Sequence, residues 1–477
     1  MLGLEHTYAD QLEGAYASLT PQGFASPERL LLNRPLAEAL GLDPDTLDAN
    51  VLSGSAIPEG AKPIAQAYAG HQFGQLNPQL GDGRAVLLGE IVDGAGRRFD
   101  LQLKGAGKTP FSRGGDGRAL LDSALREYIF SEAMHALGVP TTRALAVVTT
   151  GETLYREDRV GPGAVLARVA ASHLRVGTLE FFAVREDTEK LERLVGYAVR
   201  RHFPDRAGAD NPARALLESV AEVQAELVAR WMLLGFVHGV MNTDNFSLSG
   251  ETIDYGPCAF IDTYDPKAVF SRIDRQGRYA FGNQPNIGAW NLARMAEALL
   301  SLLAESRDEA VEFAEAALGS YVEGVRSKWR SGMRDKLGLS EEREGDDAVV
   351  DGLLEWMKAS GADYTSTFRA LSASLREADA AFAGDEAFAK WSELWKARLE
   401  GRGGDEVADA MDAVNPAYIP RSHLVEEALD RALSGDLEPT RTLLEVLERP
   451  YAAQPGKERY AAGRPAELGR HRTHCNT

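Results

Sequence analysis

HGVMNTDN, residues 238–245, is the stretch of sequence that decides the fold assignment. In phosphotransferases of the kinase type, a catalytic loop reads H-x-D-x-x-x-x-N, where the Asp takes a proton from the substrate and the Asn holds a metal ion. His238 and Asn245 match the two ends of this pattern, but Val240 stands where the Asp is expected. Valine cannot accept a proton. The stretch is therefore a phosphotransferase loop that has lost its base, an unrelated loop, or the loop of an enzyme whose base lies elsewhere.

A second motif, TIDYGP at residues 252–257, follows this loop. Kinases place the loop Asn and the Asp of a D-F-G motif on either side of a small hairpin, and the two side chains hold Mg²⁺ near the triphosphate. Asn245 and Asp254 are nine residues apart, and NFSLS and ETIDYG are short strand candidates around a Ser-Gly turn. The pair predicts two metal ligands, and the alternative is an Asp in an ordinary turn. Asp244, directly before Asn245, is the candidate replacement base.

The residues that precede the loop predict strands and one long helix. AVLLGEIVD and RRFDLQLKG are strand-like runs joined by a Gly-rich turn, which is typical of a β-hairpin, and ALLDSALREYIFSEAMHALGVP follows as a helix. Lys104 ends the second strand, where a point charge can hold a nucleotide phosphate. Glu127 on the helix is its predicted partner, with Glu132 as the competitor. The alternative is that these are solvated surface charges.

The order of predicted elements favours an α+β, protein-kinase-like bilobal fold. Two further strand candidates, TTRALAVVT and AVLARVA, complete the first part, and after about residue 176 the pattern is almost all helical. Asn211 and Pro212 mark the start of a long helix that leads into the loop. We expect a β-rich, nucleotide-binding N-lobe over residues 1–176. We expect a helical C-lobe over residues 177–477, which carries the loop, the metal motif and the C-terminal tail.

Further candidates for phosphate contact occur in turns and in one arginine pair. The turns LGDGRA and GGDGR contain small residues whose backbone N–H groups can cradle anionic oxygens. The candidates in these turns are Gly81, Gly83, Arg84, Asp116 and Gly117. Arg168 and Arg175 can clamp phosphates by bidentate bonds. Ordinary turns and a chance pair of arginines are the alternatives. LKGAGKT is not a P-loop, because Gln102 stands where the first glycine is required.

Bulk composition narrows the class of protein. The chain has 477 residues, which is too long for one compact domain, and its net charge of −19 argues against nucleic acid as a partner. No apolar run approaches the ~20 residues of a membrane helix, and the N-terminus does not resemble a secretory signal, so we expect a cytoplasmic protein. The two cysteines, Cys258 and Cys475, exclude a disulfide scaffold. They leave open one redox pair, or one buried and one loose thiol.

Several long strings of the sequence together resemble the selenoprotein O family, also called the YdiU family. They are YAGHQFGQLNPQLGDGRAVLLGE, LQLKGAGKTPFSR with GGDGRA, SALREY, HGVMNTDNFSLSGETIDYGPCAF and NPAYIPR. The resemblance implies a protein-kinase-like fold that binds ATP in a flipped orientation. It implies transfer of AMP from ATP, or of UMP from UTP, to Ser, Thr or Tyr hydroxyls of proteins, with pyrophosphate leaving. It also implies Mg²⁺ or Mn²⁺ as the cofactor.

The resemblance assigns roles to individual positions. Lys104 contacts the phosphates and pairs with Glu127, and Asp244 is the general base. Asn245 and Asp254 bind the metal. The implied nucleotide-binding residues are Gly81, Gly83, Arg84, Lys104, Asp116, Gly117, Arg168, Arg175 and Asp254. Some members carry selenocysteine in a C-x-x-U arrangement near the C-terminus, whereas this chain ends RTHCNT. We therefore hypothesise that Cys475 reaches Cys258 and locks the segment after D-Y-G-P by a disulfide.

Three activities follow from these observations. The first is a Mg²⁺-dependent protein adenylyltransferase, and the second is a conventional kinase that uses Asp244 as its base. The third is a catalytically silent pseudokinase that binds nucleotide and serves as a scaffold. A reversed nucleotide brings the α-phosphorus, and not the γ-phosphorus, to the metal and the base. That reversal accounts for a site in which Val240 has replaced the usual base and Asp244 is present.

Overall fold

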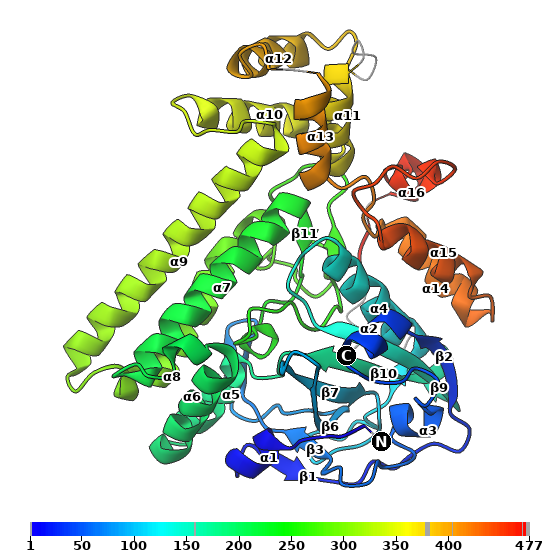
Figure 1. Ribbon diagram of the computed structural model, residues 1–477, viewed down its shortest axis with the longest axis vertical. Coiled ribbons are helices and arrows are strands. Elements are labelled where there is room, and N and C mark those ends of the chain that lie inside the picture. The colour runs from blue at the N-terminus through cyan, green and yellow to red at the C-terminus, as the bar shows by residue number, and fades with distance from the viewer. Residues whose placement is uncertain (1, 157–158, 377–381, 403, 470, 474–477) are drawn as a thin grey trace.

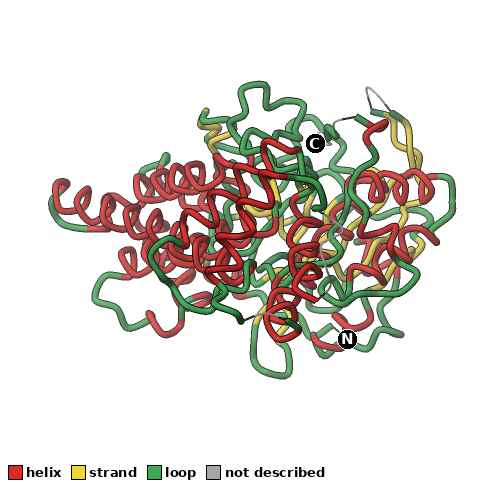
Figure 2. Tube along the Cα trace, turned by 90° about the horizontal axis from the view of Figure 1, so that it is seen from above, coloured by secondary structure: helices red, strands yellow, loops and turns green. Residues whose placement is uncertain are grey.

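The strands and the helices of this chain are largely separated in space. The structure is a computed structural model that describes residues 2–469 except 157–158, 377–381 and 403, together with residues 471–473. Seen from above, one end of the molecule consists mainly of helices, whereas most strands lie toward the other end, where further helices pack on them (Figure 2). The chain is thus a mixed α/β protein with a sheet-containing N-terminal part and a helical C-terminal part.

The N-terminal part is built on one antiparallel sheet. Its strands run in the order β1-β3-β6-β7-β10-β9-β2, and β8 pairs with β10 outside this path. The bounds are β1 (Tyr16–Ser18), β2 (Glu28–Leu32), β3 (Ile64–Gln66), β6 (Ala85–Val92), β7 (Arg98–Lys104), β8 (Ala119–Leu120), β9 (Arg143–Tyr155) and β10 (Val160–Ala170). The short helices α1 (Thr7–Gln11), α2 (Arg34–Ala39) and α3 (Ala49–Ser53) accompany it, and β4 (Gly70–Gln72) pairs with β5 (Gln75–Asn77) as a separate hairpin.

The two central strands have one apolar face and one polar face, and both faces are buried. Leu101 and Leu103 of β7 are fully buried in an apolar cluster, and Asp100 and Gln102 on the opposite face are equally buried. Gln102 lies directly opposite Arg168 of β10 in the antiparallel register. Opposed residues share a face of the sheet, so the polar face collects charged side chains beneath the helical part. The hairpin predicted from AVLLGEIVD and RRFDLQLKG is confirmed as β6 and β7.

Helix α4 (Leu121–Ala136) is the first long helix, and it packs on β9 and β10. Helix α7 (Pro212–Leu234) starts where predicted, because the Asn211 side chain accepts from the N–H groups of Ala213 and Arg214, and it ends at Gly235 with φ 75°. Helices α7, α8 (Gln284–Leu303) and α9 (Arg307–Lys336) lie side by side (Figure 1). The other helices are α5 (Val176–Ala183), α6 (Thr188–His202), α10 (Asp346–Ser360), α11 (Tyr364–Arg376), α12 (Glu386–Arg398), α13 (Asp405–Val414), α14 (Ser422–Leu433), α15 (Glu438–Leu447) and α16 (Glu458–Ala461).

A two-stranded ribbon connects two separate apolar cores. β11 (Phe236–Val237) pairs with β12 (Ala259–Phe260), and the two strands flank the 238–245 loop and the TIDYGP motif. Phe236 and Phe260 belong to the large core around α4, α7 and α8. Val237 and Ala259 belong to the second core, which α10 to α13 and the end of α9 build. Successive strand residues point to opposite faces, so each strand contributes to both cores.

The prediction of a small hairpin between Asn245 and Asp254 is wrong. Residues 243–245 form a single 3₁₀ turn, η2, and the two strand candidates make only isolated bridges. Ser247 pairs with Arg175, and Thr252 pairs with Thr141. Most backbone hydrogen bonds of this segment therefore go to the chain after β10 and before β9, and one turn bond joins Gly250 to Ser247. In the described part of the chain, no helix is both long enough and apolar enough to cross a membrane.

Lys336 is a buried lysine at the end of α9. Only 4% of its surface is exposed, and its Nζ lies 3.9 Å from the centroid of the Phe368 ring. No carboxylate of the described residues is within ion-pair distance of Nζ, and burial lowers the pKa of Lys336 to about 7. The aromatic ring and the C-terminal end of the helix both favour the cation, but neither replaces its lost hydration.

Lys336→Met should therefore stabilise the protein. We expect the free energy of unfolding in urea at pH 7 to rise by about 1–3 kcal/mol, the usual penalty for a buried unpaired polar group. The unfolded lysine keeps its ordinary pKa of 10.5. The destabilisation by the buried Lys336 is thus complete below pH 7 and decreases as the pH rises toward 10.5. The increase in the free energy of unfolding on Lys336→Met should therefore be smaller in alkaline buffer. Lys358→Met, at an exposed position of α10, is the control. No gain at pH 7 would contradict this account.

Candidate active site

Lys104, at the end of β7, is the centre of a buried ion cluster. Its Nζ lies 2.6 Å from Oε2 of Glu127 on α4, and it also donates to Oδ1 of Asp254. Glu132 pairs instead with Arg143 at 2.7 Å, so Glu127 is the helix carboxylate that reaches Lys104. One lysine thereby joins the sheet, α4 and the segment after the 238–245 loop.

Two arginines complete the cluster. Arg168 on β10 places Nη1 2.9 Å from Glu127 and 2.7 Å from Asp254, while its Nη2 donates to Oε1 of Gln102 at 2.6 Å. Nη1 of Arg175 lies 3.9 Å from Oδ2 of Asp254. The buried Nη2 of Arg175 has no hydrogen-bond partner among the described residues. Three cations thus converge on Glu127 and Asp254, with Asp82 and Asp244 near the arginines, and such a cluster of cations suits an anionic ligand.

Asp254 is held in a strained and strongly ionised state. Its φ of 64° lies in the left-handed region that residues with a side chain seldom adopt. Burial by itself would raise the pKa of Asp254, but Lys104, Arg168 and Arg175 outweigh burial and hold that pKa well below its ordinary range. The carboxylate therefore remains charged at every pH near neutrality.

Asp244 differs from Asp254 in its environment. It lies half-buried in the η2 turn, and its Oδ1 has no hydrogen-bond partner in the described part of the chain. Burial raises the pKa of Asp244 to about 6, although the charge of Arg175 acts in the opposite direction. Arg175 also donates from Nη1 to the main-chain oxygen of Asp244 at 3.0 Å. A carboxylate whose pKa lies this close to neutrality is suited to accept a proton.

Asn245 and Asp254 offer the oxygen ligands that Mg²⁺ and Mn²⁺ prefer. Nδ2 of Asn245 donates to the Val240 carbonyl at 3.0 Å, which leaves its Oδ1 as the available ligand. Nε2 of His238 donates to the Ile253 carbonyl at 2.8 Å, so the loop and the residue before Asp254 are joined directly. The described residues contain no group of three or more His, Cys, Asp or Glu that could hold a metal. Two protein oxygens fit a Mg²⁺ ion that takes its other ligands from phosphates and water.

The glycines of the first turn are required by close packing. A Cβ on Gly81 would lie 2.3 Å from Cγ of Phe111, and Gly81 has a φ of 70°. Gly83 is fixed by the Ser112 hydroxyl, which donates to its carbonyl. Arg84 is half-buried, and its carbonyl accepts from the N–H of Gly105 directly after Lys104. This turn therefore lies against the end of β7 that carries the ion cluster.

Asp116 and Gly117 lie outside the ion cluster. The exposed Asp116 carboxylate is bound by both terminal nitrogens of Arg156, at 2.9 and 3.0 Å. Gly117 allows two loops to cross, since a Cβ on it would lie 2.1 Å from the Gly107 carbonyl oxygen. Asp116 thus ties its loop to the turn after β9, and Gly117 packs its loop against itself.

Sequence reasoning missed three residues that shape the site. Asp82, between the two glycines, accepts from the N–H of Gln66 and from Nε2 of Gln102, each at 3.1 Å, and burial raises its pKa. The guanidinium of Arg175 lies over the Tyr68 ring, with its Cζ atom 4.3 Å from the ring centroid. The alternation of β7 could have identified Gln102, because it lies on the same face as Lys104. Nothing in the local sequence indicates Tyr68.

Cys258 is fully buried, and burial raises the pKa of its thiol to about 12. Arg126 of α4 donates to its main-chain oxygen, which fixes the segment against the helix. Its expected partner, Cys475, lies outside the described residues. Thr473 nevertheless donates its hydroxyl to the Pro257 carbonyl at 3.1 Å, so the last described residues run beside Cys258.

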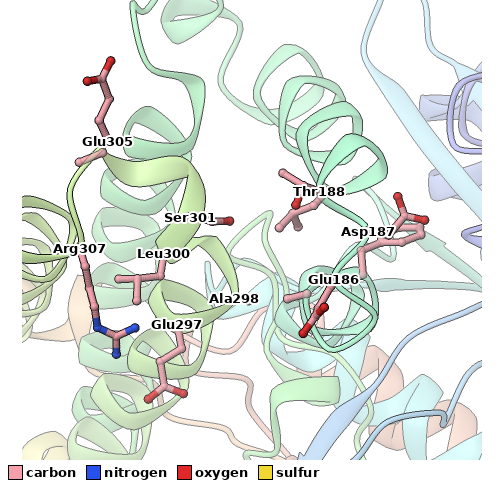
Figure 3. A pocket seen from close by; sticks show the side chains of 13 residues that line it. Glu186, Asp187, Thr188, Glu297, Ala298, Leu300, Ser301, Glu305 and Arg307 are labelled. Carbon is pink, nitrogen blue, oxygen red and sulfur yellow. The ribbon is translucent and has the colours of Figure 1, made fainter.

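A separate hollow of about 520 Å³ opens between the turn that joins α5 to α6 and the adjoining ends of α8 and α9 (Figure 3). Acidic side chains such as Glu186 and Glu297 line it, together with Arg307. None of the predicted site residues contributes to this hollow.

Comparison with known proteins gives a consistent result. A family model described as protein adenylyltransferase SelO matches residues 2–448. The protein nucleotidyltransferase YdiU of Cereibacter sphaeroides (strain ATCC 17029 / ATH 2.4.9) is 54% identical over 480 positions, which cover 99% of each chain. The protein of that name from Rhizobium leguminosarum bv. trifolii (strain WSM2304) is 54% identical over 468 positions, 96% of this chain and 93% of its own. That from Alkaliphilus metalliredigens (strain QYMF) is 52% identical over 482 positions, 99% and 97% of the two chains.

If the cations of the cluster bind an anion, the affinity for that anion should depend on each of them. Arg175→Met should weaken the binding of tripolyphosphate about tenfold or more, since a charged hydrogen bond contributes about 1.5–3 kcal/mol. Isothermal titration calorimetry without added metal gives the dissociation constant. The control is Arg193→Met on the surface of α6, which removes one positive charge far from the cluster and should leave the dissociation constant unchanged. Equal dissociation constants for the wild type and Arg175→Met would show that Arg175 does not face the anion.

Proposed function

This chain belongs to the SelO family of protein adenylyltransferases, and we propose that it transfers AMP from ATP to Ser, Thr or Tyr hydroxyls of acceptor proteins and releases pyrophosphate. UTP is the alternative donor, with UMP as the transferred group. The convergence of Lys104, Arg168 and Arg175 on Asp254 is the observation that carries the proposal. The phosphates of a nucleoside triphosphate are anions that these three cations could bind.

The proposed reaction is a single displacement at the α-phosphorus. The acceptor oxygen forms a bond to that phosphorus, the bond between the α-phosphorus and the bridging oxygen breaks, and pyrophosphate leaves with the electron pair. Asp244 accepts the proton of the hydroxyl, a role that its half-buried carboxylate and raised pKa support. Lys104, Arg168 and Arg175 neutralise the developing negative charge on the departing pyrophosphate.

Asn245 and Asp254 would hold a Mg²⁺ or Mn²⁺ ion, and the remaining assigned residues would surround the nucleotide. When bound, the ion would supply further charge neutralisation at the phosphates. The turn of Gly81, Gly83 and Arg84 is supported as part of the nucleotide site by its contact with the end of β7. Asp116 and Gly117 rest on the family resemblance alone.

We further propose that the fold is the kinase-like bilobal one, with an N-lobe over residues 1–176 and a C-lobe over residues 177–477. Every strand of the large sheet ends by Ala170, and α5 begins at Val176, which supports this division. The helix that carries Glu127 would correspond to the helix that steadies the phosphate-binding lysine in kinases.

Labelled ATP tests the reaction directly. Incubation of the purified protein and acceptor proteins with Mg²⁺ should move label into protein from α-labelled ATP but not from γ-labelled ATP. Transfer of the γ-label would indicate a kinase, and no transfer of either label would indicate a nucleotide-binding scaffold. Asp254→Ala should abolish transfer, whereas Asp205→Ala, an exposed aspartate in the turn after α6, should not. A parallel incubation with labelled UTP ranks the two donors.

Asp244→Asn separates the proton transfer from nucleotide binding. We expect kcat for transfer of the α-label to fall by about 10²–10⁴-fold, the usual contribution of a general base. The dissociation constant for ATP should stay within about threefold, because the cations that would hold the triphosphate remain in place. A kcat close to the wild-type value would remove Asp244 from the mechanism.

A further inference from the structure

The β4–β5 hairpin lies directly against the 238–245 loop. The N–H of His71 donates to Oγ1 of Thr243 at 2.7 Å, and the N–H of Phe73 donates to Oδ1 of Asn242 at 3.1 Å. A Cβ on Gly70 would lie 2.7 Å from Oδ1 of Asp244, so the hairpin backbone passes the Asp244 carboxylate with no room for a side chain. The hairpin is therefore a wall of the site, although the reaction as proposed uses none of its residues.

One buried carboxylate joins this hairpin to the loop. Oε1 of Glu180 lies 2.5 Å from Nδ1 of His71, and Oε2 accepts from the Thr243 hydroxyl at 2.6 Å. Only 3% of the Glu180 side chain is exposed. Since a carboxylate accepts hydrogen bonds, Nδ1 of His71 is the protonated ring nitrogen in this contact. The Trp290 ring packs edge-on against the His71 ring at 5.4 Å and covers it.

Helix α5 presents Glu180 from a fixed position. Gly177 lies one turn earlier on the same face, and its carbonyl accepts from the N–H of Ala69 just before the hairpin. A Cβ on Gly177 would lie 2.2 Å from the Ala69 carbonyl oxygen and 3.6 Å from Cα of Asp244. Helix α5, the β4–β5 hairpin and the 238–245 loop are thus in direct contact with one another around Asp244.

The Asp244 carboxylate depends on these neighbours for its position. Its Oδ1 has no hydrogen-bond partner among the described residues, so no direct contact to that oxygen fixes its direction. The residue is held by Arg175 on its own carbonyl, by Thr243 on the preceding residue and by the Gln72 side chain of β4, which hydrogen-bonds to the carboxylate. A shift of Thr243 would move the Asp244 side chain with it.

We propose that His71 and Glu180 are positioning residues for the transfer, because they fasten the hairpin to Thr243 and thereby hold the Asp244 carboxylate at the reacting hydroxyl. The proposal rests on the function proposed above, in which Asp244 is the base. It adds a histidine, a glutamate and a threonine that touch neither the metal ligands nor the cations of the ion cluster.

Variants of His71 test this role through kcat. His71→Ala should lower kcat for transfer of the α-label by about 10–100-fold, the cost of a misplacement near 1 Å, while the ATP dissociation constant stays within about threefold. His71→Asn should recover most of that loss, because its amide N–H can donate where Nδ1 does. His135→Ala, at an exposed position of α4, is the control for removal of a histidine. An unchanged kcat in His71→Ala, or a loss that His71→Asn does not relieve, would overturn the proposal.

A double-mutant cycle separates positioning from general stability. In an Asp244→Asn background, His71→Ala should lower kcat little further, because residues that act through one group are not additive. A second full loss would assign His71 to packing and overturn the proposal. Should His71→Ala fail to fold, Thr243→Val removes the same link and Thr243→Ser restores it, with the same two outcomes. Absence of any α-label transfer by the unmodified protein would instead overturn the proposed function.

Discussion

Charge compensation among buried groups is the constraint on which this site depends. Lys104, Arg168 and Arg175 come from the sheet and the segment after it, and each of them lies near Asp254. An unpaired buried charge costs several kcal/mol, so the cations need the two carboxylates whenever no other anion is present. A bound triphosphate would take over that compensation and release Asp254 toward a metal. The same electrostatic requirement thus holds the elements of the site together and, under the proposed function, suits the binding of a triphosphate.

The features that follow from short-range pattern could be predicted from the sequence. Alternation predicted β6 and β7, and the Asn-Pro pair predicted the first turn of α7. The pairing of Lys104 with a glutamate on the next helix was expected, with two candidates on that helix. Their position on the helix decides between them, since Glu132 faces Arg143 and the Asn33 side chain, whereas Glu127 faces Lys104. Which turn of a helix faces a given strand depends on packing, and sequence spacing alone leaves it open.

Long-range backbone pairing explains what the sequence could not predict. The residues between Asn245 and Asp254 have strand-like composition, yet their long-range backbone hydrogen bonds go to Pro140, Thr142, Leu174 and Val176. Glu180 reads as one acidic residue in an apolar helix, and His71 as one residue of a turn-rich segment. Their relation appears only when residues 109 positions apart are brought together. Polar groups buried by such contacts carry no local signature, because their partners are chosen by the fold.

The ribbon of β11 and β12 gives the outer helices a mechanical connection to the chemistry. Its phenylalanines are anchored in one core and its Val237 and Ala259 in the other, and the 238–245 loop leaves directly from β11. Local opening of α10 to α13 would therefore free one side of the ribbon while the sheet remained intact. Amide hydrogen exchange in the loop would then follow the opening of helices more than one hundred residues further along the chain. A distant cooperative folding unit would thus set the rigidity of the active site.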